Sequence, residues 1–289
     1  MSTAHVNGID IEYVTHGDPG NPALLLVMGL GAQLITWPDG FVQQLVERGF
    51  HVIRYDNRDS GLSTKFAGMP DIVALFSGDM SSASYLIEDM ADDGVALLAE
   101  LGITRAHVVG ASMGGMITQA MLINHPEQFL SACSIMSTTG DRTVGQPTGE
   151  AMAALMRPMA QSREEAIAAS VEASQVIGSP AYPASEEEVV ERAAAAYDRS
   201  YSPFGTARQL AAILASPDRT NGLRKVDMPF LVIHGEADPL VTLSGGQATA
   251  AAVPDSKLKV IPGMGHDLPD ALWPDIVNAV VANTELASV

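Results

Sequence analysis

Short apolar runs recur along the sequence, and several of them do not alternate with polar residues. The runs begin at Ala23, His51, Ala106, Phe129, Pro229 and Lys257. Strands of this kind are covered on both faces, as in a parallel sheet. Segments with a helical pattern lie between most of them. This alternation predicts an α/β fold, in which helices flank a mostly parallel, twisted sheet with right-handed crossovers.

A long segment, residues 138–226, interrupts the pattern after the fourth parallel strand and contains no convincing strand. It is rich in alanine and methionine, and two serine–glutamate spacings mark helix starts as capping boxes do. These spacings are Ser162 with Glu165 and Ser185 with Glu188. We predict a core of residues 1–137 and 227–289, with a helical cap, or lid, inserted as residues 138–226.

Composition limits the partners of this chain. Its 289 residues are 47% hydrophobic and 17% charged, which is typical of a globular protein with a substantial core. Asp and Glu together number 34 against 16 Lys and Arg, for a formal net charge of -18. Such a surface repels nucleic-acid phosphates and anionic lipids, so we expect neither a nucleic acid nor a membrane as partner.

The sequence carries no sign of an oxidising compartment or a membrane span. Cys133 is the single cysteine, so no intramolecular disulfide forms. The first residues lack the basic and apolar regions of a signal peptide. The best apolar run, residues 23–32, is shorter than the ~20 residues that cross a bilayer. We expect a cytoplasmic protein, and the oligomeric state stays open.

The segment Gly110-Ala111-Ser112-Met113-Gly114 fits the pattern G-x-S-x-G. An apolar strand precedes it and a helical pattern follows it, which is the setting of a nucleophile elbow. Glycines two residues before and after Ser112 relieve crowding in so tight a turn. We predict that this turn exposes the Ser112 hydroxyl, as a nucleophile, at the carboxyl end of the sheet. The alternative is a plain strand-to-helix turn with a serine N-cap.

A serine nucleophile needs a base, and the base needs a carboxylate that orients it. In a nucleophile-elbow fold the chain order is serine, acid, histidine. Asp238 follows the apolar run that begins at Pro229, and His266 lies in a Gly-rich loop after the last run. We therefore predict Ser112, Asp238 and His266 as a catalytic triad. Glu236 is the alternative to Asp238.

We do not assign His234 or Asp267 to the catalytic triad, although each lies close in sequence to one of its members. His234 precedes Asp238 in the same strand exit, and we expect it to make a structural hydrogen bond. Asp267 follows His266 directly. Because a side chain rarely turns back onto the imidazole next to it in the chain, we expect Asp267 to be solvated.

The oxyanion that forms in acyl transfer needs two backbone N–H donors. We expect one from Met113, directly after the nucleophile. The other is expected from Leu30, in a loop where Gly29 and Gly31 let the backbone approach a substrate. The alternative for this loop is a plain glycine-containing turn. Such chemistry needs no metal and no organic cofactor.

Several segments resemble the α/β-hydrolase fold family, over nearly the whole chain outside the cap. "YDNRDSGLS" resembles the family's D-x-R-G-x-G-x-S segment, and "GASMGG", "HGEADP" and "GMGH" resemble its elbow, acid and histidine segments. The family commonly carries His-Gly in the oxyanion loop, where this chain has Met28-Gly29. Within the family, residues 24–64 and "IPGMGHDLP" look most like aclacinomycin methylesterase-like esterases. This resemblance implies a carboxylic ester hydrolase.

The leading interpretation is a serine hydrolase that cleaves the carboxylic ester of an apolar small molecule through an acyl-enzyme. Three alternatives stay open: a cofactor-free perhydrolase or haloperoxidase-like enzyme, a carbon–carbon bond hydrolase, and a non-enzymatic ligand receptor on the same fold. The sequence does not name the ester. Met152, Met156 and Phe204 are candidates for an apolar pocket, since methionine adapts to irregular ligands. Simple packing is the alternative for these side chains.

Overall fold

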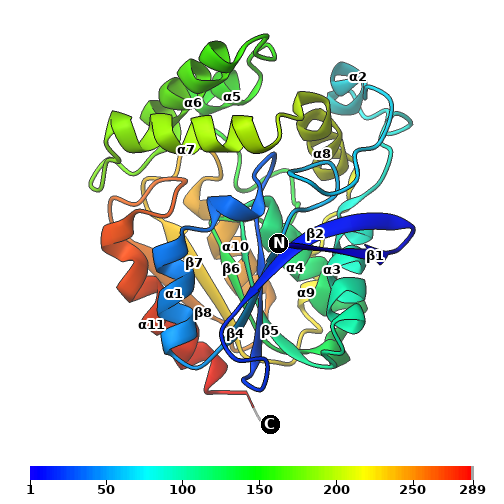
Figure 1. Cartoon of the computed structure of the whole chain (residues 1–289), viewed down its shortest axis with the longest axis vertical. Coiled ribbons are helices and arrows are strands. Elements are labelled where there is room, and N and C mark those ends of the chain that lie inside the picture. Colours follow the sequence, from blue (N-terminus) through cyan, green and yellow to red (C-terminus); the bar gives the residue numbers. More distant parts are fainter. Residues whose placement is uncertain (288–289) are drawn as a thin grey trace.

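An eight-stranded sheet forms the centre of the computed structural model, which describes residues 1–287 (Figure 1). The strand order is β1-β2-β4-β3-β5-β6-β7-β8. β1 pairs antiparallel with β2, and β2 pairs antiparallel with β4, whereas β4, β3 and β5 to β8 pair in parallel. The strands are β1 (Ser2–Val6), β2 (Ile9–His16), β3 (Ala23–Val27), β4 (His51–Tyr55), β5 (Ala106–Ala111), β6 (Phe129–Ile135), β7 (Phe230–Gly235) and β8 (Lys257–Ile261).

Helices cover both faces of this sheet, as the sequence pattern predicts. On one face lie α1 (Asp39–Glu47) and α11 (Trp273–Thr284), and on the other lie α3 (Ile87–Glu100), α4 (Met113–Asn124), α9 (Thr220–Leu223) and α10 (Leu243–Ala252). The connections also hold η1 (Leu34–Thr36), α2 (Ile72–Phe76), η2 (Pro126–Gln128) and η3 (Asp270–Leu272). Within residues 1–287, no helix combines the length and the apolar character that a bilayer crossing requires.

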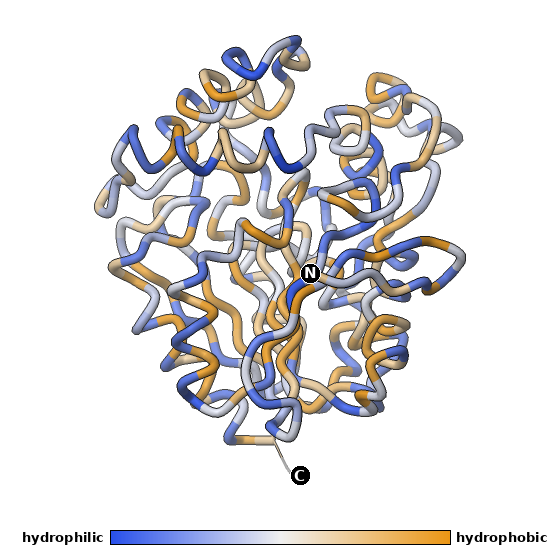
Figure 2. Tube along the Cα trace, in the orientation of Figure 1, coloured by the Kyte–Doolittle hydropathy of each residue, from blue (hydrophilic) through white to orange (hydrophobic). Residues whose placement is uncertain are grey.

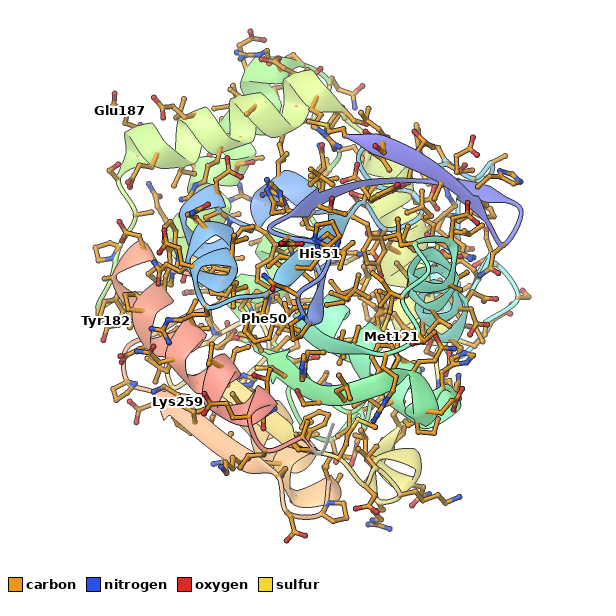
Figure 3. All side chains as sticks on the ribbon, turned by 60° about the horizontal axis from the view of Figure 1, so that its bottom comes forward. Phe50, His51, Met121, Tyr182, Glu187 and Lys259 are labelled. Atoms are coloured by element: carbon orange, nitrogen blue, oxygen red, sulfur yellow. The ribbon has the colours of Figure 1, made fainter. Side chains whose placement is uncertain are left out.

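The buried strands show why their sequences lack alternation. Every residue of β3 is buried. Leu24 and Leu26 pack toward α1 and α11, while Leu25 and Val27 pack toward α3 and α4. Hydrophobic residues accordingly concentrate along the central strands (Figure 2), and Met121 of α4 lies within the packed interior (Figure 3). The predicted α/β architecture with a mostly parallel sheet is confirmed.

Helices alone connect β6 to β7. The described residues 136–229 contain α5 (Gly149–Leu155), α6 (Arg163–Ile177), α7 (Glu186–Arg199), α8 (Pro203–Ala215) and α9, and no strand. α5, α6 and α7 lie above the sheet in Figure 1, and α8 lies beside them. We propose that α5 to α8 form the cap predicted for residues 138–226. α9 packs instead against α4 and α10, and its Leu223 belongs to the core.

Buried ion pairs join α7 and α8 to the loop that follows β4. Arg208 of α8 donates to both carboxylate oxygens of Asp59, at 2.9 and 2.7 Å. Arg199, the last residue of α7, lies 2.7 Å from Asp56. Both carboxylates are fully buried, at 0% side-chain exposure. A buried carboxylate without a partner is costly, so these arginines hold α7 and α8 to the core.

We predict that Arg208→Met lowers the free energy of unfolding by about 3–5 kcal/mol, because Asp59 then stays buried without its cationic partner. Arg163→Met is the matched control. Arg163 makes the same two-bond contact with Asp198, at 2.7 and 2.9 Å, but both side chains are exposed. Its loss should therefore change stability little. Chemical denaturation measures both variants, and equal losses would contradict the role given to the buried pair.

Candidate active site

Ser112 occupies a strained turn between β5 and α4. Its backbone angles, φ 56° and ψ -121°, lie in a region that residues other than glycine rarely adopt. Such a conformation costs about 1–3 kcal/mol and persists only where the surroundings impose it. Here the Ser112 N–H donates to the Ile135 carbonyl at 2.9 Å, and the Ser137 hydroxyl donates to the Ser112 carbonyl at 2.8 Å. The end of β6 thus holds the turn in place.

The glycines of the motif are required by close backbone contacts. A Cβ at position 110 would lie 2.1 Å from the Gly114 carbonyl oxygen. A Cβ at position 114 would lie 2.1 Å from the carbonyl oxygen of Val27, at the end of β3. The turn therefore closes on itself and packs against β3 only because both positions lack a side chain.

The structure brings His266 to the Ser112 hydroxyl. His266 lies in the loop after β8, and its Nε2 is 2.9 Å from Ser112 Oγ. Its Nδ1 is 2.7 Å from Oδ2 of Asp238, which follows β7. Because the carboxylate accepts the Nδ1–H, Nε2 is left free to accept the serine proton. The three residues of the predicted triad form one continuous hydrogen-bonded chain.

Asp238 rather than Glu236 contacts the imidazole. Asp238 is 4% exposed, and its Oδ1 accepts the backbone N–H groups of Leu240 and Val241, each at 2.9 Å. These bonds satisfy the buried carboxylate and fix the oxygen that faces His266. Glu236 is exposed on the surface.

His234 makes the structural hydrogen bond expected from the sequence. It is fully buried, and its Nε2–H donates to the Val241 carbonyl at 2.7 Å. Burial lowers the pKa of His234, so the ring stays neutral. His234 therefore supports the turn that carries Asp238 without supplying a second charge.

Asp267 differs from the expectation of a solvated side chain. It is half-buried and accepts a hydrogen bond from the Ser179 hydroxyl, which belongs to the segment after α6. Burial raises the pKa of Asp267, and the Ser179 hydrogen bond opposes that change. The expectation was wrong because the partner lies 88 positions away in the sequence.

The loop that contains Leu30 lies directly beside Ser112. A Cβ at Gly29 would be 3.0 Å from the Ser112 Cβ. The Gly31 N–H donates to the side-chain oxygen of Gln209 at 2.7 Å. Among the hydrogen bonds of residues 1–287, neither the Leu30 N–H nor the Met113 N–H has an acceptor. The described residues therefore leave both of these N–H groups without an intramolecular acceptor.

Gln209 is a site residue that the sequence analysis missed. It lies on α8, is fully buried, and donates to the Arg58 carbonyl at 2.7 Å while it accepts the Gly31 N–H. Gln209 therefore links α8 both to the loop beside Leu30 and to the loop of Arg58. The one signal for it was an amide side chain directly before the apolar stretch "LAAILA".

A cavity of about 510 Å³ lies between the core and α5 to α8. Leu30 and Gly31 form part of its wall, and many of the other lining residues are alanines and methionines of the proposed cap. Of the three predicted pocket residues, Met156 lines this cavity, whereas Met152 and Phe204 do not. The Phe204 side chain is 52% exposed. Within residues 1–287, no group of three or more side chains suits a metal ion.

Comparisons with known proteins agree with this fold and resemblance. A sequence profile of the alpha/beta hydrolase fold matches residues 22–270. Rhodomycin D methylesterase DnrP of Streptomyces peucetius is 28% identical, over 94% of this chain and 94% of its own length. 3-Oxoadipate enol-lactonase 2 of Acinetobacter baylyi is 27% identical, over 90% of this chain and 87% of its own length. The predicted resemblance to methylesterases is confirmed.

A solved structure supports the same fold. The crystal structure of the enol-lactonase from Burkholderia xenovorans superimposes on this chain with a TM-score of 0.77. The superposition covers 98% of this chain and 100% of that one, at 21% sequence identity. At this identity, the likeness concerns the fold alone.

We predict that Ser112→Gly is more stable than Ser112→Ala by about 1–2 kcal/mol, because glycine adopts a positive φ without strain. Both variants lose the hydroxyl and its bond to His266, so their comparison isolates the backbone. Thermal and chemical denaturation measure the difference. Equal stability of the two variants would mean that Ser112 is not strained.

Proposed function

The chain belongs to the alpha/beta hydrolase fold family, and we propose that it is a serine hydrolase that cleaves a carboxylic ester through an acyl-enzyme. The observation that carries this proposal is the contact of one imidazole with two partners, Ser112 Oγ at 2.9 Å and Asp238 Oδ2 at 2.7 Å. The names of its relatives, a methylesterase and an enol-lactonase, support the ester bond as the one cleaved.

The reaction begins with attack of Ser112 Oγ on the ester carbonyl. His266 Nε2 takes the serine proton, and the buried Asp238 carboxylate stabilises the imidazolium that forms. The same imidazolium then gives the proton to the departing alcohol. Water, activated by the neutral imidazole, attacks the acyl-enzyme and releases the acid.

The oxyanion of each tetrahedral intermediate is bound by the N–H groups of Leu30 and Met113. The second belongs to the first residue of α4, so the positive end of the helix dipole adds to the stabilisation. Gln209 occupies the neighbouring Gly31 N–H, which leaves the Leu30 N–H as the donor on that side.

The substrate's apolar part fits the cavity beneath the cap. Its charged lining residues are already paired, Asp59 with Arg208 and Arg157 with Glu172. Tyr197 also lines the cavity and stacks on Tyr201 with ring centroids 4.7 Å apart. A wall of this kind favours a neutral, bulky group over a second charge on the substrate.

We predict that Ser112→Ala reduces hydrolysis of p-nitrophenyl esters by ~1,000-fold or more, because triad residues act as a unit. Organophosphate labelling followed by mass spectrometry should place the adduct of the wild type on Ser112. Circular dichroism checks that the variant is folded. A folded variant with more than a tenth of the wild-type rate would contradict the assignment.

We predict that Ala193→Leu shifts ester preference toward smaller substrates by ~10–200-fold, the scale on which apolar pockets discriminate. Ala193 of α7 lines the cavity, so the larger side chain fills it. Ala195→Leu is the matched control, since Ala195 lies on the same helix and is exposed. A panel of p-nitrophenyl esters of increasing acyl length gives the comparison. If both variants keep the wild-type order of rates, the cavity does not select the substrate.

A further inference from the structure

The last residue of α6 and the two residues after it, 177–179, form hydrogen bonds with the loop that carries His266. The His266 N–H donates to the Ile177 carbonyl at 2.7 Å. The Gly265 N–H donates to the Ser179 hydroxyl oxygen at 2.8 Å. That hydroxyl in turn donates to Oδ1 of Asp267. Three consecutive residues of the histidine loop are therefore bonded to the proposed cap.

The Ser179 hydroxyl is the centre of this contact. Ser179 is 2% exposed, so water does not replace its partners. Its oxygen accepts from Gly265, and its proton goes to Asp267. Removal of this one hydroxyl leaves a buried N–H without an acceptor and releases the Asp267 carboxylate.

The two segments also touch along their backbones. A Cβ at Gly265 would lie 2.4 Å from the Gly178 carbonyl oxygen. Further along, the Ala181 N–H donates to the Gly263 carbonyl at 3.2 Å. Tyr182 then packs on the core (Figure 3). The histidine loop therefore lies against the cap segment from residue 263 to residue 267.

The core bonds to the loop through the Met264 carbonyl and through the His266 side chain. The Ala237 N–H donates to the Met264 carbonyl at 3.0 Å, and Asp238 accepts the His266 Nδ1–H. The backbone N–H groups of Gly265 and His266 both find their acceptors in the cap segment. The core thus orients the His266 imidazole, and the proposed cap holds the backbone N–H groups of Gly265 and His266.

We propose that Ser179 is a positioning residue for His266: through Gly265 and Asp267 it holds the loop so that Nε2 stays within reach of Ser112 Oγ. This inference rests on the proposed function, in which His266 is the base. The cap therefore does more than shape the cavity, since it fixes one member of the triad. A displacement of about 1 Å at a reacting group costs up to ~100-fold in rate.

The test compares Ser179→Ala with the wild type on a soluble p-nitrophenyl ester. We expect kcat to fall ~10–100-fold, because the base is held less well. KM should change less than about threefold, because Ser179 does not line the 510 Å³ cavity. Ser185→Ala is the matched control. Ser185 caps α7 within the same proposed cap and its hydroxyl bonds to Glu188 of that helix, so this variant should keep the wild-type kcat.

A second pair of variants tests the contact from the other side. Asp267→Asn keeps an oxygen that accepts the Ser179 hydroxyl, whereas Asp267→Ala removes it. We expect the Asn variant to retain most of kcat and the Ala variant to match Ser179→Ala. Equal losses in both would show that the charge of Asp267, not the hydrogen-bonded position, matters, and would overturn the proposal. This pair also serves if Ser179→Ala does not fold.

The outcomes separate this inference from the proposed function. A wild type without Ser112-dependent ester hydrolysis refutes the proposed function. An active wild type with an unchanged kcat in Ser179→Ala overturns the positioning role, as does an equal loss in Ser185→Ala or a change in KM alone. A crystal structure of Ser179→Ala measures the distance between His266 Nε2 and Ser112 Oγ independently of turnover. A separation equal to the wild-type value would also overturn the proposal.

Discussion

The left-handed backbone of Ser112 is the constraint on which the site depends. The chain must pass from β5 to α4 within one residue at φ 56°. This turn requires residues without side chains on both sides of Ser112. Gly110 and Gly114 supply it, and packing of β5 and α4 into the core provides the free energy that keeps the strain in place. The result is a hydroxyl that projects from the edge of the sheet, with the N-terminus of α4 beside it.

The parallel sheet brings distant parts of the chain to this hydroxyl. Ser112, Asp238 and His266 follow β5, β7 and β8, whose carboxyl ends lie at the same edge of the sheet. Hydrogen bonds and burial then give Asp238 and His234 different roles. Backbone N–H groups satisfy the buried Asp238 carboxylate, while burial lowers the pKa of His234 and keeps that ring neutral.

The proposed cap is attached to the core at two separate places. On one side, Arg199 and Arg208 reach the buried carboxylates of Asp56 and Asp59. On the other, the segment of Ser179 bonds with the histidine loop. The cavity lies below the helices that these contacts hold, and Gln209 links one of them to the Leu30 loop. The cavity and the proposed catalytic residues are therefore held by the same contacts.

The sequence by itself determined the features that depend on neighbouring residues. Strands without polar alternation, separated by helices, indicated a parallel sheet covered on both faces. The spacing of Gly110, Ser112 and Gly114 indicated the nucleophile elbow, because steric crowding within a few residues determines which side chains such a turn accepts. Chain order then gave Asp238 and His266, which the sheet brings together. Only the tertiary structure decided which side chains of the proposed cap face the cavity, because α6 has no strong apolar face to set its rotation. It also decided the contacts of Ser179 and Gln209, which join residues 88 and 178 positions apart and leave no local pattern in the sequence.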